Sequence, residues 1–273
     1  MNRLDRLMAG PLLFFSLLAA GVIAALLTRV SWPELSGAFG HPETRYALGF
    51  SLVVSAGAMA VAVSIGAPSA YFLARQGFPG KGVLETLLDL PLVMPPLVAG
   101  VGLLFLFGRD LLGGPLARVG IHLILTPWGA VAAQAFIATP IVIRAARTAF
   151  ESVDPGYEET ARTLGLKPLT IFLRVNLPLA GRGIVSGLIL AWARAMGEFG
   201  ATLMVAGATR FRTESLPIAV YLNLSSGEVG IAVSCALVLL GAAFVMLLAA
   251  RFVQKRGAGA DPGRGDRSWP TCA

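Results

Sequence analysis

The sequence predicts an all-α integral membrane protein with about six transmembrane helices. Hydrophobic residues make up 56% of the 273 residues and charged residues only 14%, whereas soluble domains carry about 25% charged residues. The mean hydropathy is +0.75. The hydrophobic residues gather in runs long enough to cross a hydrocarbon core about 30 Å thick. One long polar segment, residues 151–178, separates two of these runs. This pattern is typical of a multi-pass membrane protein.

Six hydrophobic runs are predicted to span the membrane. The first follows a short basic segment, as in a signal peptide, but it is longer than the roughly 7–15 apolar residues of a cleaved signal peptide, so we expect it to remain as a helix. Residues 1–256 are predicted to form one membrane domain. The tail, 257–273, is rich in Gly, Arg, Asp and Pro and is predicted to be disordered. The predicted spans are 7–28, 46–74, 90–108, 119–143, 183–206 and 229–250.

The Lys and Arg residues predict the orientation of these spans. With the N-terminus inside, 15 of the 22 Lys and Arg residues fall on the inner side and 6 on the outer side, and Arg194 lies within a span. Because basic residues favour the cytoplasmic side, both termini and the polar segment are predicted to be cytoplasmic. The net charge of +7 therefore fits membrane topology better than binding to nucleic acid.

The polar segment has the end signals of two short helices. Asp154 can cap the first helix, with Pro155 at its first position. Gly165 can end that helix, because glycine adopts a positive φ at low cost. Pro168 begins a second helix, which the sequence Asn176-Leu177-Pro178 is predicted to stop before the next span.

The first of these two helices is predicted to be amphipathic. Tyr157, Ala161 and Leu164 recur at helical spacing and form one apolar face. Glu158 and Glu159 lie near the helix start, where the helix dipole favours negative charge. On the water-facing side of a membrane protein, such a hairpin is predicted to be a docking surface. The alternative is a connector that lies on the bilayer surface.

The spacing within the polar segment resembles the cytoplasmic EAA loop of ABC importer permeases. That loop reads Glu-Ala-Ala, three residues, Gly, nine residues, then Ile, any residue, Leu and Pro, and this chain keeps both spacings with Thr160 for the second Ala and Val175 for Ile. The resemblance implies a type I ABC importer fold, in which the segment is a coupling loop for a cytoplasmic ATPase. The residues expected to carry this coupling are Glu158, Glu159, Ala161, Leu164, Gly165 and Pro178.

Three further stretches resemble the molybdate, tungstate and sulfate branch of these permeases. They are MPPLVAGVGLLFLFGRDLLGG at 94–114, AWARAMGEFGATLMVAG at 191–207 and TESLPIAVYLNLSSGEVG at 213–230. The last stretch is more similar to molybdate or tungstate permeases than to sulfate permeases. The resemblance implies import of a tetrahedral oxyanion, molybdate or tungstate first, with sulfate or thiosulfate as the alternative.

The resemblance also implies the partners of this chain. We expect a homodimer in the cell inner membrane, two cytoplasmic ATP-binding subunits that hold the ATP and Mg, and an external substrate-binding protein. The sequence itself has no phosphate-binding GxxxxGK[ST] pattern, because Gly80-Lys81-Gly82 lacks the earlier glycine and the hydroxyl residue. Catalytic carboxylate pairs and metal-ligand spacings are absent, and Cys235 and Cys272 suggest neither a disulfide framework nor a metal site. We therefore expect a transport subunit without its own enzyme activity or cofactor.

Two groups of residues are candidates for the transport path or its gate. Pro95 and Pro96, near the start of the third span, free backbone groups that neighbouring helices or a water-lined path must satisfy, so this helix either lines the path or is kinked inside the protein. Arg194 and Glu198 in the fifth span are one helical turn apart on one face. An isolated charge there costs at least about 2.5–3.5 kcal/mol, so we expect the two to neutralise each other or a partner on an adjacent subunit.

The role of Arg194 and Glu198 has three interpretations. A structural or gating clasp is favoured, because Glu198 would cancel most of the attraction of Arg194 for a dianion. A direct oxyanion contact by Arg194 is the second. In the third, the chain is a gradient-driven secondary transporter in which Glu198 binds a proton or cation. That interpretation requires no partner ATPase and leaves the spacing from Glu159 to Pro178 unexplained. A passive scaffold is also disfavoured, because it needs neither proline-broken spans nor an intramembrane ion pair.

The orientation can be tested by cysteine labelling. In a chain whose native cysteines are replaced by serine, Arg162→Cys and Lys167→Cys should react with a membrane-impermeant thiol reagent only in inverted vesicles, and Arg212→Cys only in intact cells, because of the bias in basic residues. Labelling of Arg162→Cys in intact cells would contradict this orientation.

Overall fold

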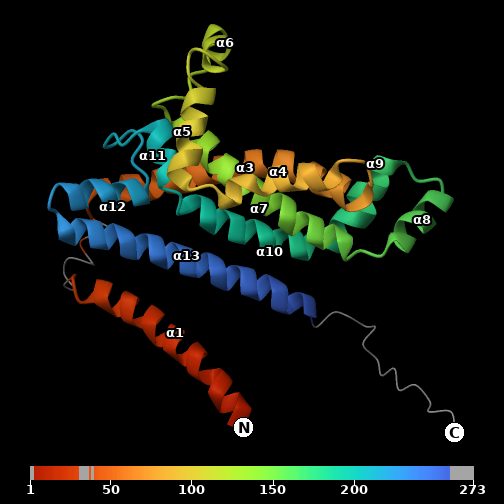
Figure 1. Ribbon diagram of the computed structural model, residues 1–273, viewed down its shortest axis with the longest axis horizontal. Helices are drawn as coiled ribbons and strands as arrows, with labels where there is room; N and C mark the ends of the chain where they lie inside the picture. Colours follow the sequence, from red (N-terminus) through yellow and green to blue (C-terminus); the bar gives the residue numbers. More distant parts are fainter. Residues whose placement is uncertain (1–2, 31–36, 38–39, 259–273) are drawn as a thin grey trace. The chain divides into compact units, whose positions relative to one another are not determined.

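The structure, a computed structural model, describes residues 3–30, 37 and 40–258, which form helices joined by turns and loops and contain no strand (Figure 1). The all-α prediction is therefore confirmed. The predicted disordered tail lies outside the described residues, apart from the last two residues of α13. The elements are α1 (Arg3–Leu27), α3 (Pro42–Arg75), α4 (Lys81–Val93), α5 (Pro96–Leu106), α6 (Gly113–Arg118), α7 (Pro127–Glu151), α8 (Pro155–Thr163), α9 (Pro168–Ile171), the π-helical turn η1 (Phe172–Asn176), α10 (Leu177–Met196), α11 (Gly200–Ala206), α12 (Leu216–Ser225) and α13 (Val229–Ala258).

The chain divides into two compact units. The first consists of residues 1–51 and 208–241, and the second of residues 52–207 and 242–273. The helices α3 and α13 contribute residues to both units. The polar hairpin, the paired prolines and the intramembrane ion pair all belong to the second unit.

Five helical stretches of the described residues are long and apolar enough to cross a membrane, and there are six if α4 and α5 count as one bent span. The helices α1, α3 and α13 confirm the predicted spans 7–28, 46–74 and 229–250. The other three predicted spans differ from the structure at positions where proline or glycine occurs.

The fourth span begins later than predicted. The prediction placed a helix over 119–143, but α7 begins only at Pro127. Thr126 precedes it in an extended conformation, and its hydroxyl accepts a hydrogen bond from the backbone N–H of Gly129 at 3.3 Å. A capping threonine followed by proline is a strong helix start, because the missing N–H of proline is unpaired there in any case.

The third span is broken in two. The helix predicted over 90–108 instead ends at Val93 in α4 and restarts at Pro96 in α5, with a bend of 111° between them. Met94 and Pro95 are both extended, at ψ 132°. Each precedes a proline, and the residue before a proline is disfavoured from helical conformation. Two consecutive prolines therefore break the helix of the third span, where a single proline would only kink it.

The fifth span is also broken. The prediction of one helix over 183–206 was wrong, since α10 ends at Met196 and α11 begins at Gly200. A Cβ atom on Gly200 would lie 3.0 Å from both Leu97 N and Pro96 Cβ. Only glycine lets the start of α11 approach the start of α5 this closely. The break at 197–199 and the bend at Met94–Pro95 thus lie next to each other.

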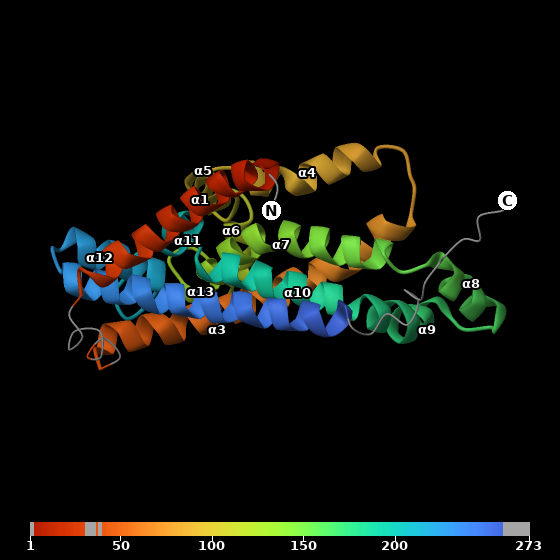
Figure 2. The same cartoon turned by 90° about the horizontal axis from the view of Figure 1, so that it is seen from below.

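Small residues hold the second unit together around α7. The helices α7 and α10 run side by side in both Figure 1 and Figure 2. A Cβ atom on Gly187 would come within 2.2 Å of Ala145 Cβ, so the two backbones are in close contact. One side of α7 packs on α3 and α10, and another packs on α5 and α11. The hairpin of α8 and α9 lies beyond the end of α7 in both views.

The first unit has a smaller core in which α12 and the start of α3 participate. Its buried apolar residues are Ala47, Leu216, Ala219, Cys235 and Val238. The Ser51 hydroxyl accepts a hydrogen bond from the Leu216 backbone N–H at 2.8 Å, and the Tyr46 hydroxyl donates to the Arg212 carbonyl at 3.0 Å. The Glu214 carboxyl is buried, and burial raises its pKa above the ordinary value.

Candidate functional site

The polar hairpin is built as its end signals predict, up to its second helix. The Asp154 carboxylate accepts a hydrogen bond from the Gly156 backbone N–H at 2.8 Å, and Pro155 opens α8. Gly165 has φ 78°, and it donates to the Arg162 carbonyl at 2.9 Å while Leu166 donates to the Ala161 carbonyl at 3.1 Å. This pair of bonds is the Schellman ending of a helix. The predicted turn at Gly165 is confirmed.

The end of the hairpin differs from the prediction. Asn176-Leu177-Pro178 does not stop the second helix, because α9 continues through the π-helical turn η1 directly into α10. Pro178 lies in the first turn of α10, directly after the π-helical turn. The hairpin is therefore joined to a long helix of the bundle without a loop, so the two are mechanically continuous.

The predicted apolar face of α8 is divided between two directions. Ala161 is buried, whereas Tyr157 is exposed and Leu164 is 75% exposed. Leu169 and Leu173 from the second half of the hairpin are exposed as well. Exposed large apolar side chains indicate an interaction surface where they face water, as predicted for this hairpin. Glu159, Gly165 and Pro178 are also exposed.

Glu158 points in the opposite direction from this surface. Its carboxylate is buried and forms an ion pair with Arg75 of α3, with 2.5 Å between Nε and Oε1. Its other oxygen lies 3.6 Å from Arg162 Nη2. Of the residues grouped as coupling residues in the sequence, Glu158 thus attaches the hairpin to α3 and Ala161 is buried, whereas Glu159 and Leu164 are exposed.

Arg194 and Glu198 form the expected ion pair, but not on one helix. Arg194 lies in the last turn of α10 and Glu198 in the break before α11, with 2.7 Å between Nη1 and Oε2. The side chain of Glu198 is 1% exposed and that of Arg194 is 44% exposed. The second oxygen of Glu198 accepts a hydrogen bond from the Ala201 backbone N–H at 3.1 Å. Glu198 therefore closes the break between the two helices, and Arg194 compensates its charge.

The structure brings the two groups of candidate path residues together. Pro96 packs beside Gly200, two residues after Glu198 in the sequence. Sequence reasoning did not connect them, because nothing local shows which helix packs against the prolines. It also missed Arg75, which contacts Glu158 and the Val153 carbonyl of the hairpin. The only signal was its position as a single charge at the end of a long apolar run.

The sequence model of the family described as "binding-protein-dependent transport system inner membrane component" matches residues 62–257. The chain belongs to this family. The ModB molybdenum transport system permease protein of Mycobacterium tuberculosis is 37% identical over 231 residues, which cover 84% of this chain and 88% of that protein. The ModB of Escherichia coli is 38% identical over 218 residues, covering 78% and 94%. The sulfate transport system permease protein CysT of Salmonella typhimurium is 32% identical over 249 residues, covering 90% of each.

Solved structures of ABC transporters share the fold of this inner membrane component. A bacterial alginate ABC transporter in complex with an alginate-bound periplasmic protein matches with a TM-score of 0.74 at 15% identity, covering 93% of this chain and 94% of that one. The inward-facing MetNI methionine ABC transporter matches at 0.58 and 18% identity, covering 76% and 92%. The type I ABC importer permease fold predicted from the EAA-like loop is confirmed.

A double-mutant cycle tests the clasp interpretation in this inner membrane component. Arg194→Met leaves a buried, uncompensated carboxylate and should lower the yield of folded protein in membranes about tenfold, because breaking one side of a buried pair costs several kcal/mol. Glu198→Gln should lose less, because the surviving Arg194 is half-exposed. The double variant should recover most of the yield. Additive losses in size-exclusion and thermal-melting assays would contradict a clasp.

Proposed function

We propose that this chain is the permease subunit of an ATP-driven importer and forms the path for a tetrahedral oxyanion, molybdate or tungstate first. Two copies of the chain lie in the inner membrane, each with both termini in the cytoplasm. Two cytoplasmic ATP-binding subunits dock on the two hairpins and hold the ATP and Mg, so that this chain carries no cofactor. An external binding protein delivers the oxyanion.

The exposed hairpin is the observation that carries this proposal. It presents Tyr157, Leu164 and Leu169 to the surroundings on a frame fixed by the Asp154 cap and the Gly165 turn. The EAA-like spacing lies on the same frame. A connector resting on the bilayer would need none of these end signals, whereas a docking surface needs a fixed geometry.

Relatives named for molybdenum transport support the choice of substrate. Two of these match at 37% and 38% identity, compared with 32% for the relative named for sulfate transport. Sulfate or thiosulfate remains the alternative within the family. Because Glu198 compensates Arg194 at 2.7 Å, the path offers a dianion no isolated positive charge at this point. Selectivity would then reside mainly in the binding protein, with a path that only has to accept the dianion.

The mechanism follows from the attachment of the hairpin to α10. When ATP closes the two partner subunits, they move the two hairpins, and the helices joined to them shift between inward-open and outward-open arrangements. A gradient-driven transporter using Glu198 is less well supported. That carboxylate is buried, and both of its oxygens are engaged, by Arg194 and by the Ala201 N–H. A proton or cation site needs an oxygen that the path can reach.

Transport by a reconstituted complex tests the proposal. The tagged chain is purified from its own cells with its associated subunits and placed in liposomes together with its binding protein and ATP on the cytoplasmic face. We expect ATP-dependent uptake of radioactive molybdate that excess tungstate suppresses and excess sulfate suppresses less. Stronger suppression by sulfate would select the alternative substrate. The proposed function would be overturned if no ATPase copurified with the tagged chain, or if an ion gradient drove uptake without ATP.

Gly165 offers a test of the hairpin that involves no packing. At φ 78°, a residue with a Cβ is strained by about 1 kcal/mol or more, yet a Cβ at Gly165 would meet no atom within 4 Å. Gly165→Val should therefore weaken ATPase binding and uptake while the chain still inserts. Gly77→Val is the matched control, since Gly77 is open to solvent without positive φ. Equal coupling in both variants would show that the hairpin conformation is irrelevant to docking.

A further inference from the structure

The last turn of α3 holds the hairpin through a buried ion pair. Arg75, the final residue of α3, contacts Glu158 of α8 with its Nε and donates a hydrogen bond from Nη2 to the Val153 carbonyl at 3.1 Å. The side chains of Arg75 and Glu158 are only 13% and 7% exposed. The contact of Nε with Glu158 is an ion pair without hydrogen-bond geometry, and Nη2 makes the hydrogen bond. One side chain thus fixes both the beginning of the hairpin and its first helix.

Tyr71, one turn earlier on α3, holds the other end of the hairpin. Its ring packs edge-on against Phe150 and Phe172, with centroids 5.4 and 4.8 Å away. Its hydroxyl accepts a hydrogen bond from Asn176 Nδ2 at 3.2 Å. Phe172 and Asn176 belong to η1, where the hairpin joins α10. Two residues of one helical turn therefore contact the hairpin at its beginning, its first helix and its end.

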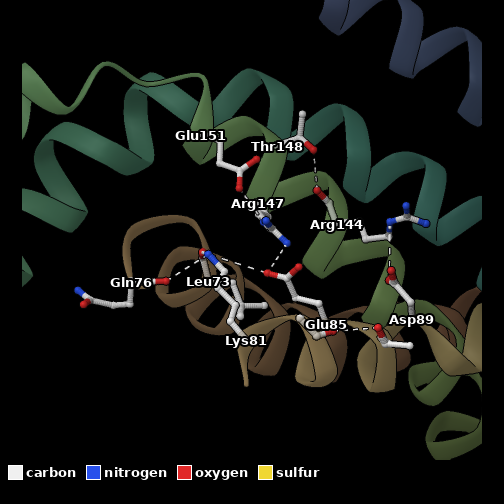
Figure 3. Close-up of polar contacts among 11 residues, drawn as sticks. Leu73, Gln76, Lys81, Glu85, Asp89, Arg144, Arg147, Thr148 and Glu151 are labelled. Carbon is white, nitrogen blue, oxygen red and sulfur yellow. Dashed lines mark hydrogen bonds and ion pairs between the residues drawn. The ribbon is translucent and has the colours of Figure 1, made fainter. Parts of the chain in front are cut away.

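The same turn of α3 is tied to α4 on another side. Lys81 Nζ donates to the Leu73 carbonyl at 2.6 Å and to the Gln76 carbonyl at 3.1 Å, which satisfies two carbonyls at the end of α3 (Figure 3). Figure 3 also shows Glu85 of α4 reaching Arg147 of α7, at 2.9 Å. The end of α3 is therefore a junction between the hairpin and the bundle.

From this turn, α3 continues into the packed part of the second unit. Met59 and Ala62 of α3 pack with Ala138 of α7 and with Ala191 and Ala195 of α10. Ala195 adjoins Arg194, the partner of Glu198. The last turn of α3 is thus connected to the ion pair by contiguous packing along one helix, which contains Pro68 between the two regions. A packed network of this kind can carry coupling.

We propose that Arg75 is the positioning residue that couples the hairpin to the transport path, by seating α8 on the last turn of α3. This inference rests on the proposed function, since it assumes that an ATPase moves the hairpin. It assigns Glu158 an inward role as the counterpart of Arg75, and it leaves contact with the partner to the exposed residues of the hairpin. Loss of the seat lets α8 move without α3, so that ATP hydrolysis continues and transport falls.

The test compares transport with ATP hydrolysis in the purified complex. The variant is Arg75→Met combined with Glu158→Gln, because the double change leaves no buried unpaired charge and should permit folding. We expect molybdate uptake per ATP hydrolysed to fall about tenfold, with the amount of bound ATPase within about twofold of the original chain. Arg144→Met is the matched control, because Arg144 is an exposed arginine paired with Asp89 at 3.7 Å and should change the ratio by less than about twofold.

A second measurement uses the chain without its ATPase. Hydrogen exchange of the α8 amides in the purified permease should be about tenfold faster in the double variant than in the original chain or in Arg144→Met, because the local opening energy falls. Unchanged exchange together with an unchanged uptake ratio would overturn the role of Arg75. Absence of ATP-driven uptake in the original chain would instead refute the proposed function, and the exchange result would still show whether Arg75 seats the hairpin.

Discussion

Backbone N–H and C=O groups inside a bilayer need partners within the protein, because no water is there to replace them. Apolar helices of this chain are interrupted at Met94–Pro95 and at 197–199. The backbone groups at the two interruptions are satisfied in different ways. At the first, two prolines remove N–H groups, and Met94 donates to the Leu90 carbonyl at 3.0 Å. At the second, the Glu198 carboxylate accepts the Ala201 N–H. The two interruptions meet at Gly200. The arrangement of α5, α10 and α11 depends on this shared junction.

Charged residues of the second unit determine the relative positions of its helices, and they contribute less to the stability of the fold. Exposed pairs such as Arg144 with Asp89 are worth about 0–1 kcal/mol. The buried pair of Arg75 and Glu158 differs, because removal of one partner costs about 3–5 kcal/mol. Cohesion instead comes from small residues such as Gly187 and Ala145 in close contact. The buried pair therefore makes one position of the hairpin on α3 much lower in free energy than slightly shifted positions.

Local chemistry decided which parts of this fold were predictable. Asp154 and Gly165 were placed correctly, since capping and positive φ depend on a few adjacent residues. The helix start at Pro127 and the continuous helix at Pro178 were not predicted, because a proline can either interrupt a helix or begin one. Only the preceding cap or the continuing backbone distinguishes the two cases. The contact of Arg75 with Glu158 joins residues far apart in the chain. Helical periodicity in the sequence gives no information about such a contact. The roles assigned to the coupling and path residues remain predictions.

The inward direction of Glu158 has a thermodynamic consequence for the outer face of the hairpin. With that carboxylate turned away, the hairpin still exposes several large apolar side chains, among them Tyr157, Leu164 and Leu169. Association through such a face removes apolar surface from water and gives a negative heat-capacity change. Ionic strength screens charges but not this contribution. A partner held mainly by these apolar side chains would therefore dissociate more readily on cooling than in concentrated salt, because hydrophobic association weakens on cooling.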